Sequence, residues 1–265
     1  MNLKEKYGEW ALVTGASSGI GREFVLEFAR NGINSLALAR RKDRLLELKE
    51  EVKKQYGIEV VPIEADLSDL NFYEKIEPIV KNYSIGILVN NAGFGSSGPF
   101  YKNDSNAEIK MTIVNCVAPT ILTHKILPQM IERKKGAIIF LGSIVGINPT
   151  PYMTVYSATK AFNVFIGAGL YEELRKLKLN IDVLTLNPGG TVTEFQRISN
   201  ITSGPFAAYP DEVVKTAIKN LGKKPSTVHG FVNKLTLFFA KLLPLKIRLS
   251  ATAKVVTKIS DRFNN

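Results

Sequence analysis

The sequence predicts an α/β fold in which a doubly wound parallel sheet of about seven strands has helices on both faces. Two observations lead to this prediction. Short apolar runs rich in β-branched residues recur along the chain, and helix-length amphipathic stretches separate them. Runs such as ILVNN, AIIFLG and IDVLTL are apolar almost throughout, which is typical of strands that are buried on both faces. Strands that alternate with helices are joined by right-handed crossovers.

The predicted strands are these apolar runs, at residues 10–14, 35–39, 58–63, 86–90, 137–142, 181–186 and 227–230. The stretches between them have the length and pattern of helices, at residues 19–31, 41–56, 69–82, 105–133, 155–178 and 210–221. No repeat or low-complexity linker interrupts residues 1–230. We therefore expect one domain over 1–230, followed by a basic amphipathic extension over 231–265.

The composition is that of a globular chain, because 265 residues with 45% hydrophobic content can bury a full core. The single thiol, Cys116, cannot form an internal disulfide, and we expect it to be a small core residue. His124 and His229 have no acid or thiol at ligand spacing, so no metal site is predicted. The start MNLKEKYGEW lacks the apolar core of a signal peptide, which favours a cytoplasmic location.

A glycine-rich turn follows the first predicted strand in ALVTGASSGIGREF. Without a Cβ at Gly15, Gly19 and Gly21, backbone N–H groups can approach a pyrophosphate at the start of the first helix. Any tight strand-to-helix turn would use similar glycines. The position, at the end of the first strand and the start of the first helix, favours a dinucleotide site.

The end of the second strand indicates which dinucleotide is bound. NAD sites usually place an acid here to hold the ribose 2′-hydroxyl, whereas this chain has Ala39 followed by Arg40 and Arg41. Because a guanidinium would bind a 2′-phosphate, the sequence favours NADP(H) over NAD. The alternative is that Arg40 and Arg41 only begin a solvated helix.

Tyr156 and Lys160 are spaced i, i+4 and are expected on one face of one helix. An ammonium beside a phenol favours the phenolate, so Lys160 is expected to lower the pKa of Tyr156 from its reference of about 10 toward neutrality. Most such pairs are only surface neighbours. Ser143 follows an apolar strand, at the edge where open α/β sheets bind ligands, and its hydroxyl could polarise a carbonyl oxygen.

Asn115 lies four residues before Pro119 in a predicted helix. Proline has no N–H to donate, so the main-chain carbonyl of Asn115 should be free to hold an ordered water near Lys160. The alternative is a plain helix kink, since Pro128 lies in the same helix.

Taken together, these motifs resemble the short-chain dehydrogenase/reductase family over about residues 8–230, through TGASSGIG, NNAG, Asn115, Ser143, YSATK and NPGGTVT. The resemblance implies a Rossmann-type catalytic domain with integral substrate loops. It also implies hydride transfer between a nicotinamide and a carbonyl or secondary alcohol. Tyr156 would be the general acid in reduction, and Lys160 would lower its pKa and hold the nicotinamide ribose. Ser143 would steady the substrate oxygen, and Asn115 would seat the water.

The same resemblance implies further cofactor contacts. Ser17, Ser18 and Ile20 would lie along the phosphates beside Gly15, Gly19 and Gly21. Asp66, with Leu67, would lie at the adenine, and Asn90 and Thr14 would tie neighbouring strands together. One departure, Gly190–Thr191–Val192 after NPG, leaves the carboxamide contact of Thr191 open. The remaining implied contacts are Asn91, Ala92, Gly93, Pro188, Gly189 and Thr193.

The segments expected to frame the substrate, 94–100, 144–153 and 194–210, are mostly apolar or neutral, and Arg197 is their only basic residue. They favour an apolar carbonyl compound such as a 3-oxoacyl chain, a lipid ketone or a hydrophobic aldehyde. The competing class is a nucleotide-binding scaffold or sensor without turnover, which could be membrane associated.

The net charge of +11 is concentrated near the C-terminus, because residues 211–265 hold 11 basic and three acidic residues. The remaining +3 does not favour nucleic acid as a partner. Within 231–262 the longest uncharged stretch is 235–240 and Pro244 follows, which excludes a spanning helix. The extension therefore packs on its own domain or on a twin subunit in a homo-oligomer, or it lies on an anionic membrane surface. Packing is favoured, because amphipathic terminal helices usually find a core.

Overall fold

The computed structural model describes residues 2–199, 201 and 207–260, and its central feature is a seven-stranded sheet in the order β3-β2-β1-β4-β5-β6-β7. All six strand pairs are parallel, which confirms the predicted fold class. The strands are β1 (Trp10–Thr14), β2 (Asn34–Ala39), β3 (Val60–Glu64), β4 (Ile85–Asn90), β5 (Gly136–Leu141), β6 (Ile181–Asn187) and β7 (Ser226–Val228).

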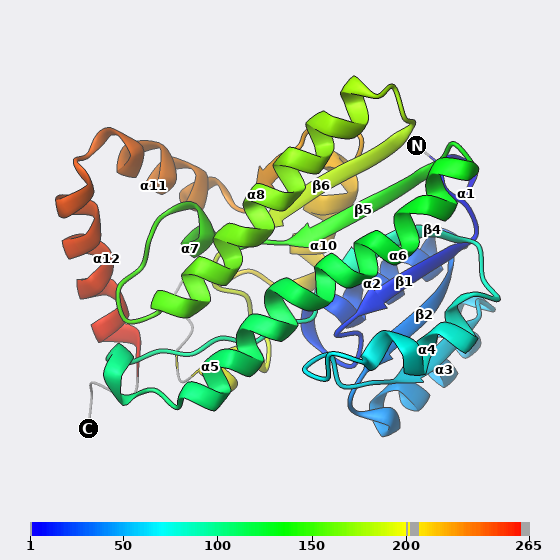
Figure 1. Ribbon diagram of the computed structural model, residues 1–265, viewed down its shortest axis with the longest axis horizontal. Coiled ribbons are helices and arrows are strands. Elements are labelled where there is room, and N and C mark those ends of the chain that lie inside the picture. The colour runs from blue at the N-terminus through cyan, green and yellow to red at the C-terminus, as the bar shows by residue number, and fades with distance from the viewer. Residues whose placement is uncertain (1, 200, 202–206, 261–265) are drawn as a thin grey trace.

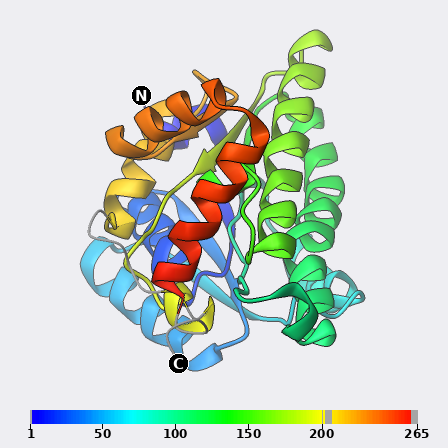
Figure 2. The ribbon, with the colours of Figure 1, turned by 90° about the vertical axis from the view of Figure 1, so that its left-hand side faces the viewer.

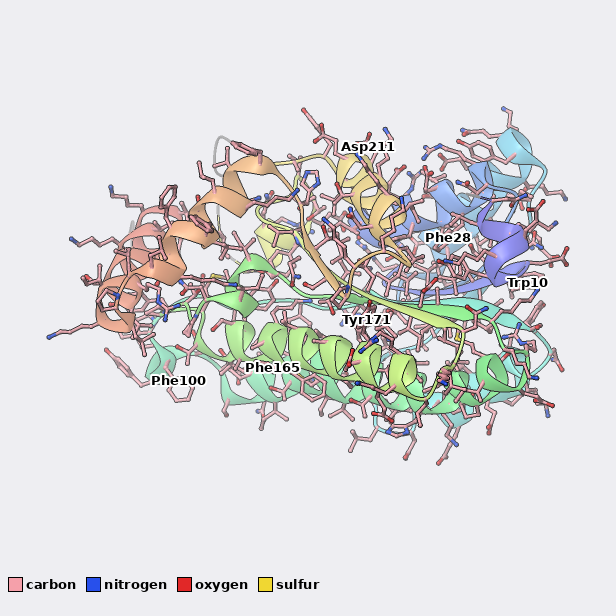
Figure 3. The ribbon with its side chains drawn as sticks, turned by 90° about the horizontal axis from the view of Figure 1, so that it is seen from above. Trp10, Phe28, Phe100, Phe165, Tyr171 and Asp211 are labelled. Carbon is pink, nitrogen blue, oxygen red and sulfur yellow. The ribbon has the colours of Figure 1, made fainter. Side chains whose placement is uncertain are left out.

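Helices cover both faces of the sheet (Figures 1 and 3). One layer contains α2 (Gly19–Arg30), α3 (Lys42–Tyr56) and α10 (Pro210–Asn220), whose apolar residues share a cluster. The other contains α4 (Phe72–Val80), α6 (Ala118–Glu132) and α8 (Thr154–Lys176). Short elements complete the body: α1 (Leu3–Tyr7), α5 (Ser105–Thr112), α7 (Ile144–Ile147), α9 (Phe195–Ser199) and a 3-10 turn (Phe100–Lys102).

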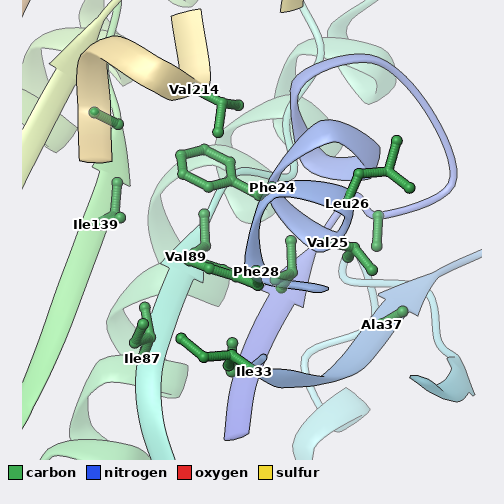
Figure 4. Packing of buried hydrophobic residues seen from close by; sticks show 14 of the residues in the cluster. Phe24, Val25, Leu26, Phe28, Ile33, Ala37, Ile87, Val89, Ile139 and Val214 are labelled. Atoms are coloured by element: carbon green, nitrogen blue, oxygen red, sulfur yellow. The ribbon is translucent and has the colours of Figure 1, made fainter. Parts of the chain in front are cut away.

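The alternation of side chains along the strands divides the core between the two layers. Ile87 and Val89 of β4 lie in the cluster on the α2 side of the sheet (Figure 4), whereas Leu88, between them, faces the α4, α6 and α8 layer. All three are fully buried. Burial on both faces is the reason that the central strands have almost uninterrupted apolar sequences.

The single helix predicted over residues 105–133 is interrupted just before Pro119. Between α5 and α6, residues Ile113–Val117 form a π-helical segment, in which the N–H of Ala118 bonds the carbonyl of Ile113. Pro119 follows in the first turn of α6 and has no N–H to continue the usual ladder. The axis continues through this segment, so the proline changes the hydrogen-bond pattern rather than ending the helix.

The first helix, α1, was not predicted. It has only five residues, too few for a periodic pattern, and tertiary contacts hold it: Leu3 and Tyr7 are buried, and the Tyr7 hydroxyl donates to Asp182 Oδ2 at 2.8 Å.

The C-terminal extension forms α11 (Phe231–Leu242) and α12 (Leu245–Ile259), which change direction at Pro244. Figures 1 and 2 show both helices beyond the carboxyl ends of the strands. Thr252 Oγ1 of α12 bonds the carbonyl of Pro149 at 3.5 Å, and Val256 is buried against Met153 and Tyr156. α12 therefore contacts the domain of its own chain through these residues. In the described part of the chain, every helix is too short or too polar to cross a bilayer.

Candidate active site

A cavity of about 1260 Å³ opens along the carboxyl ends of the strands. This is the edge where open parallel sheets bind ligands, and the order β2-β1-β4 places the turn after β1 at the point where the winding reverses. Of the residues predicted to act in catalysis or to contact the cofactor, all except Gly21 and Asn115 line this cavity. The structure thus brings together residues from separate parts of the chain.

The glycine turn after β1 requires its glycines on steric grounds. A Cβ at Gly21 would lie 2.3 Å from the carbonyl oxygen of Gly15, and Gly19 has a left-handed φ of +56°. Gly21 therefore acts behind the cavity wall, where it lets α2 approach the turn. Ser17, Ser18 and the first turn of α2 face the cavity, so free N–H groups and the positive end of the helix dipole are available to an anion.

The two arginines after β2 have different environments. Arg41 donates to Ser17 Oγ at 3.0 Å and Ser18 Oγ at 2.8 Å, and it pairs with Glu194 at 2.6 Å. Hydrogen bonds from Arg44 and Arg41 lower the pKa of the Glu194 carboxyl to about 2. Arg41 therefore belongs to a hydrogen-bond network that stabilises the glycine turn after β1.

Arg40, in contrast, is exposed at the cavity wall and has no ion-pair partner within 4.0 Å among the described residues. Burial acts to raise the pKa of Asp66, but the hydrogen bonds from Ser68 and the charge of Arg40 outweigh it and lower that pKa. Arg40 is thus a cation available at the adenosine end of the cavity.

Tyr156 and Lys160 lie on one face of α8 and are both buried, at 6% and 5% exposure. Lys160 Nζ donates to the carbonyl of Leu141, the last residue of β5, at 2.8 Å. Nζ is 5.9 Å from the centroid of the Tyr156 ring. Ser143, just after β5, forms the N-cap of α7 and also lines the cavity. Strand and helix thus place three polar side chains at one wall.

The expected effect of Lys160 on the pKa of Tyr156 is wrong for this site. Burial raises the pKa of Tyr156 above its usual value of 10, and a hydrogen bond with Ser143 only partly opposes this. Burial also lowers the pKa of Lys160 to about 8. Desolvation penalises the charged form of each group, so the Tyr156 phenol is protonated at neutral pH.

Asn115 lies in the π-helical segment behind the cavity, where its side chain joins two parts of the site. Nδ2 donates to the Phe94 carbonyl at 3.0 Å and to Thr159 Oγ1 at 2.9 Å, while Oδ1 accepts from the Phe94 N–H. The prediction of a free main-chain carbonyl is wrong, because Asn163 Nδ2 donates to that oxygen at 2.9 Å. Asn115 therefore connects the segment after β4 to α8.

The polar residues at the ends of β1 and β4 are positioned by side-chain hydrogen bonds. Thr14 Oγ1 accepts from the N–H groups of Asn91 and Ala92 at 3.0 and 2.9 Å, so it ties β1 to the segment after β4 as expected. Asn90 differs from expectation: its Nδ2 donates to Thr123 of α6 at 3.2 Å rather than to a neighbouring strand.

The far side of the cavity is formed by the C-terminal helices, which sequence reasoning did not place in the site. Arg197, predicted to frame the substrate, is exposed and does not line the cavity. Residues 200 and 202–206 of the same predicted segment lie outside the described residues. The sequence contains a signal for this role of α12, because the residues of the helix that line the cavity recur at helical spacing. They are Arg248, Ala251, Thr252, Val255, Val256 and Ile259.

The Cys116 thiol is half-buried, and burial raises its pKa to about 11, so it is a thiol rather than a thiolate at neutral pH. The described ranges contain no cluster of three or more His, Cys, Asp or Glu side chains that could hold a metal ion.

A parallel sheet with an anion-binding turn after β1, beside a buried tyrosine, lysine and serine, is the arrangement of a nucleotide-dependent oxidoreductase that acts on CH–OH or C=O groups. The chain belongs to the short-chain dehydrogenase family, whose model matches residues 9–203. It is an oxidoreductase of this class.

Two curated relatives show the range of similarity. The chain is 34% identical to the human very-long-chain 3-oxoacyl-CoA reductase over 248 residues, 91% of this chain and 78% of that protein. It is 32% identical to the 7beta-hydroxysteroid dehydrogenase of Clostridium sardiniense, over 88% of this chain and 90% of that protein.

Solved structures agree in fold. A 7beta-hydroxysteroid dehydrogenase structure superposes with a TM-score of 0.88 at 28% identity, covering 95% of this chain and 99% of the other. A short-chain dehydrogenase from Sphingobium yanoikuyae in complex with NADPH gives a TM-score of 0.78 at 32% identity, covering 88% of this chain and 93% of the other.

Proposed function

We propose that this protein transfers a hydride between NADP(H) and a largely apolar carbonyl compound or the corresponding secondary alcohol. One observation carries the proposal: Tyr156, Lys160 and Ser143 share a single cavity with the glycine turn after β1. A dinucleotide on that turn and a carbonyl beside Tyr156 can therefore meet in one cavity. The turn suits a dinucleotide phosphate, because Ser17, Ser18 and the first turn of α2 face the cavity at the positive end of the helix.

The bound NADPH would supply the hydride, and the protein would supply the proton and the orientation. The buried Tyr156 phenol is protonated at neutral pH and would donate its proton to the developing alkoxide. Ser143 Oγ would donate a hydrogen bond to the same oxygen. Lys160 would stabilise the tyrosinate that remains and hold the nicotinamide ribose. Asn115 would act indirectly, by holding Phe94 and α8 in place.

The preference for NADP(H) over NAD rests on the residues after β2. Ala39 leaves no carboxylate to repel a 2′-phosphate, and Arg40 offers an unpaired guanidinium among the described residues. The NADPH complex of the Sphingobium relative supports this choice. Asp66, Leu67, Asn91, Ala92 and Gly93 would line the adenosine side, while the other end of the cofactor would meet Pro188, Gly189, Thr191 and Thr193.

The proposed apolar substrate follows from the walls next to Tyr156. Met153 and Val256 are buried against the tyrosine, and α11 adds Leu237 and Phe239 to the cavity. Relatives named for a 3-oxoacyl-CoA and for a hydroxysteroid support a bulky, mostly apolar carbonyl compound.

The test measures NADPH oxidation against a panel of long-chain ketones, steroid ketones and aldehydes. Tyr156→Phe should lower kcat by roughly 10²- to 10⁴-fold while the Kd of NADPH stays within about twofold, because only the proton donor is removed. An active phenylalanine variant would refute the role of Tyr156. A wild-type protein that binds NADPH but turns over no member of the panel would favour the scaffold alternative.

Two surfaces support the expectations about partners. Phe162 and Phe165 are 38% and 76% exposed on α8, the latter on the outer side of the helix in Figure 3, which supports a homo-oligomer. Along α11, exposed Phe231, Phe238 and Leu242 accompany Lys234 and Lys241, which supports peripheral contact with an anionic membrane.

These two expectations have separate tests. Changing Phe231, Phe238 and Leu242 to Ser should abolish sedimentation with anionic liposomes without affecting the cavity, since none of the three lines it. Changing Phe162 and Phe165 to Ser should instead lower the mass measured by light scattering. Wild-type protein that neither sediments nor exceeds the monomer mass would refute both.

A further inference from the structure

Arg248 is an uncompensated charge at the end of the cavity formed by α12. Its Nη1 donates to Asn148 Oδ1, a neutral acceptor, at 3.3 Å. Its Nε is buried and has no hydrogen-bond partner among the described residues. Residues 231–259 contain no Asp or Glu, and no carboxylate of the described chain lies within ion-pair distance of Arg248.

This arrangement is unfavourable for the protein alone. A guanidinium carries five N–H donors, and a buried donor that lacks an acceptor loses the hydrogen bond it would make to water. By contrast, Arg41 on the same cavity pairs with Glu194, and Lys160 donates to the carbonyl of Leu141. Every other residue of α11 and α12 that lines the cavity is uncharged. The buried Nε–H of Arg248, which has no partner among the described residues, is therefore accounted for most simply by an acceptor that a ligand brings.

The position of Arg248 relative to Tyr156 defines what such a ligand looks like. Val256, eight residues later on the same face of α12, packs against Tyr156. Eight residues of α-helix span about 12 Å. A group bound by Arg248 would thus lie on the order of 10 Å from the reacting carbonyl, across a wall of apolar residues.

We infer that Arg248, oriented by Asn148, forms a subsite for an anionic group, a carboxylate or a phosphate, at the far end of an otherwise apolar carbonyl substrate. The planar guanidinium binds either anion with two parallel hydrogen bonds. This inference rests on the proposed function, because it assigns the distal end of the substrate that Tyr156 protonates. It makes Arg248 a specificity residue rather than a catalytic one.

The experiment compares paired substrates that differ only in the distal charge. For the carboxylate, the pair is a straight-chain methyl ketone with a terminal carboxylate about 12 Å from the carbonyl and the methyl ester of the same compound. For the phosphate, the pair is a straight-chain methyl ketone with a terminal phosphate at the same distance and the same compound with a terminal hydroxyl in place of the phosphate. Each is assayed with wild type, Arg248→Gln and Arg248→Lys. Lys254→Gln is the control, since Lys254 lies on the same helix but does not line the cavity.

Arg248→Gln should raise the KM of the anionic member of at least one pair by roughly 10- to 100-fold, with kcat within about twofold and the neutral member unaffected. Arg248→Lys should retain part of the preference, and Lys254→Gln should retain all of it. Which pair responds identifies a carboxylate or a phosphate as the source. An equal effect on the charged and neutral members of both pairs would overturn the inference, because it would assign Arg248 only to holding α12 in place.

A binding measurement separates this inference from the proposed function. Calorimetry with a saturated fatty acid of the same length, and separately with the alkyl phosphate of that length, needs no turnover. Wild type should bind one of the two at least about tenfold more tightly than Arg248→Gln. If that difference appears in a protein that turns over no ketone, the anion subsite stands and the proposed function fails. If neither anion distinguishes the two proteins, the subsite is refuted whatever the activity.

Discussion

Asn163 Nδ2 donates to the main-chain carbonyl oxygen of Asn115 at 2.9 Å, joining α8 to the π-helical segment before α6. Pro119 cannot supply an N–H to that carbonyl, and the side chain of Asn163, which is 3% exposed, supplies one instead. A second bond from Asn163 Nδ2, to the Thr159 carbonyl at 3.2 Å, fixes the side chain in this position. A side chain of α8, the helix that carries Tyr156, thus stabilises the π-helical segment.

Asn163→Ala should therefore lower the free energy of unfolding by about 1–3 kcal/mol, because it leaves a buried carbonyl without its donor. Urea titration measures this. Asn82→Ala is the matched control: Asn82 Nδ2 bonds the Pro78 carbonyl in an exposed position, where water can replace it, so the loss should stay below about 1 kcal/mol. Equal losses in the two variants would contradict the role given to Asn163.

Gly21→Ala and Gly169→Ala should have opposite effects on stability. An added Cβ at Gly21 meets the backbone of Gly15, which must move, so we expect a loss of roughly 2 kcal/mol or more and weaker NADPH binding. At Gly169, inside α8, an added Cβ meets nothing within 4 Å, and alanine should stabilise the helix by about 0.5–1 kcal/mol. Thermal unfolding of both variants checks the pair, and a neutral Gly21→Ala would show that the turn tolerates a side chain.

Lys160→Met should change how stability depends on pH. Burial lowers the pKa of Lys160 from 10.5 to about 8, so between these values the unfolded chain binds more protons than the folded one. The wild type therefore gains stability as pH rises through this window, and below pH 8 it bears the cost of the buried ammonium. The methionine variant lacks this gain. Its free energy of unfolding relative to wild type should fall by about 3 kcal/mol between pH 7 and 10.5.

Lys176→Met, at an exposed position on the same helix, is the control for this experiment and should show no comparable trend. Denaturant titrations at several pH values measure the difference. A constant difference between Lys160→Met and wild type across the window would mean that Lys160 is not desolvated.

We also expect Lys160→Met to lose turnover, because the ammonium no longer supports the tyrosinate.

The two arginines after β2 should affect cofactor binding differently. Arg40→Ala removes the unpaired guanidinium and should raise the Kd of NADPH by roughly 10- to 100-fold, while the Kd of NADH stays almost unchanged. Arg41→Ala removes the contacts with Ser17, Ser18 and Glu194 that stabilise the glycine turn after β1. It should therefore weaken the binding of NADPH and of NADH to a similar degree. Fluorescence titration with each nucleotide measures the ratio. If Arg40→Ala weakens NADH as much as NADPH, the proposed cofactor preference is wrong.

Much of the fold could be predicted because its signals are local. The buried strands are short apolar runs, the helices between them are amphipathic, and strict alternation of the two leads to one parallel sheet. The glycine turn and the i, i+4 pair of Tyr156 and Lys160 are local as well, since each depends on backbone geometry over a few residues. Such features are decided by sterics and periodicity before any long-range contact forms.

The chain alone therefore determined the sheet, the anion-binding turn and the face of α8 that bears the tyrosine. Tertiary structure decided the rest, because these properties depend on which groups exclude water and which groups meet. Burial, rather than the neighbouring ammonium, sets the pKa of Tyr156. Asn163 occupies the carbonyl of Asn115, and Glu194 engages Arg41. The sequence of the basic C-terminal extension is also compatible with contact to a partner or a membrane. In the structure its helices form one side of the cavity, and Arg248 is among the lining residues. The extension takes this position because its apolar face buries Val256 against Tyr156.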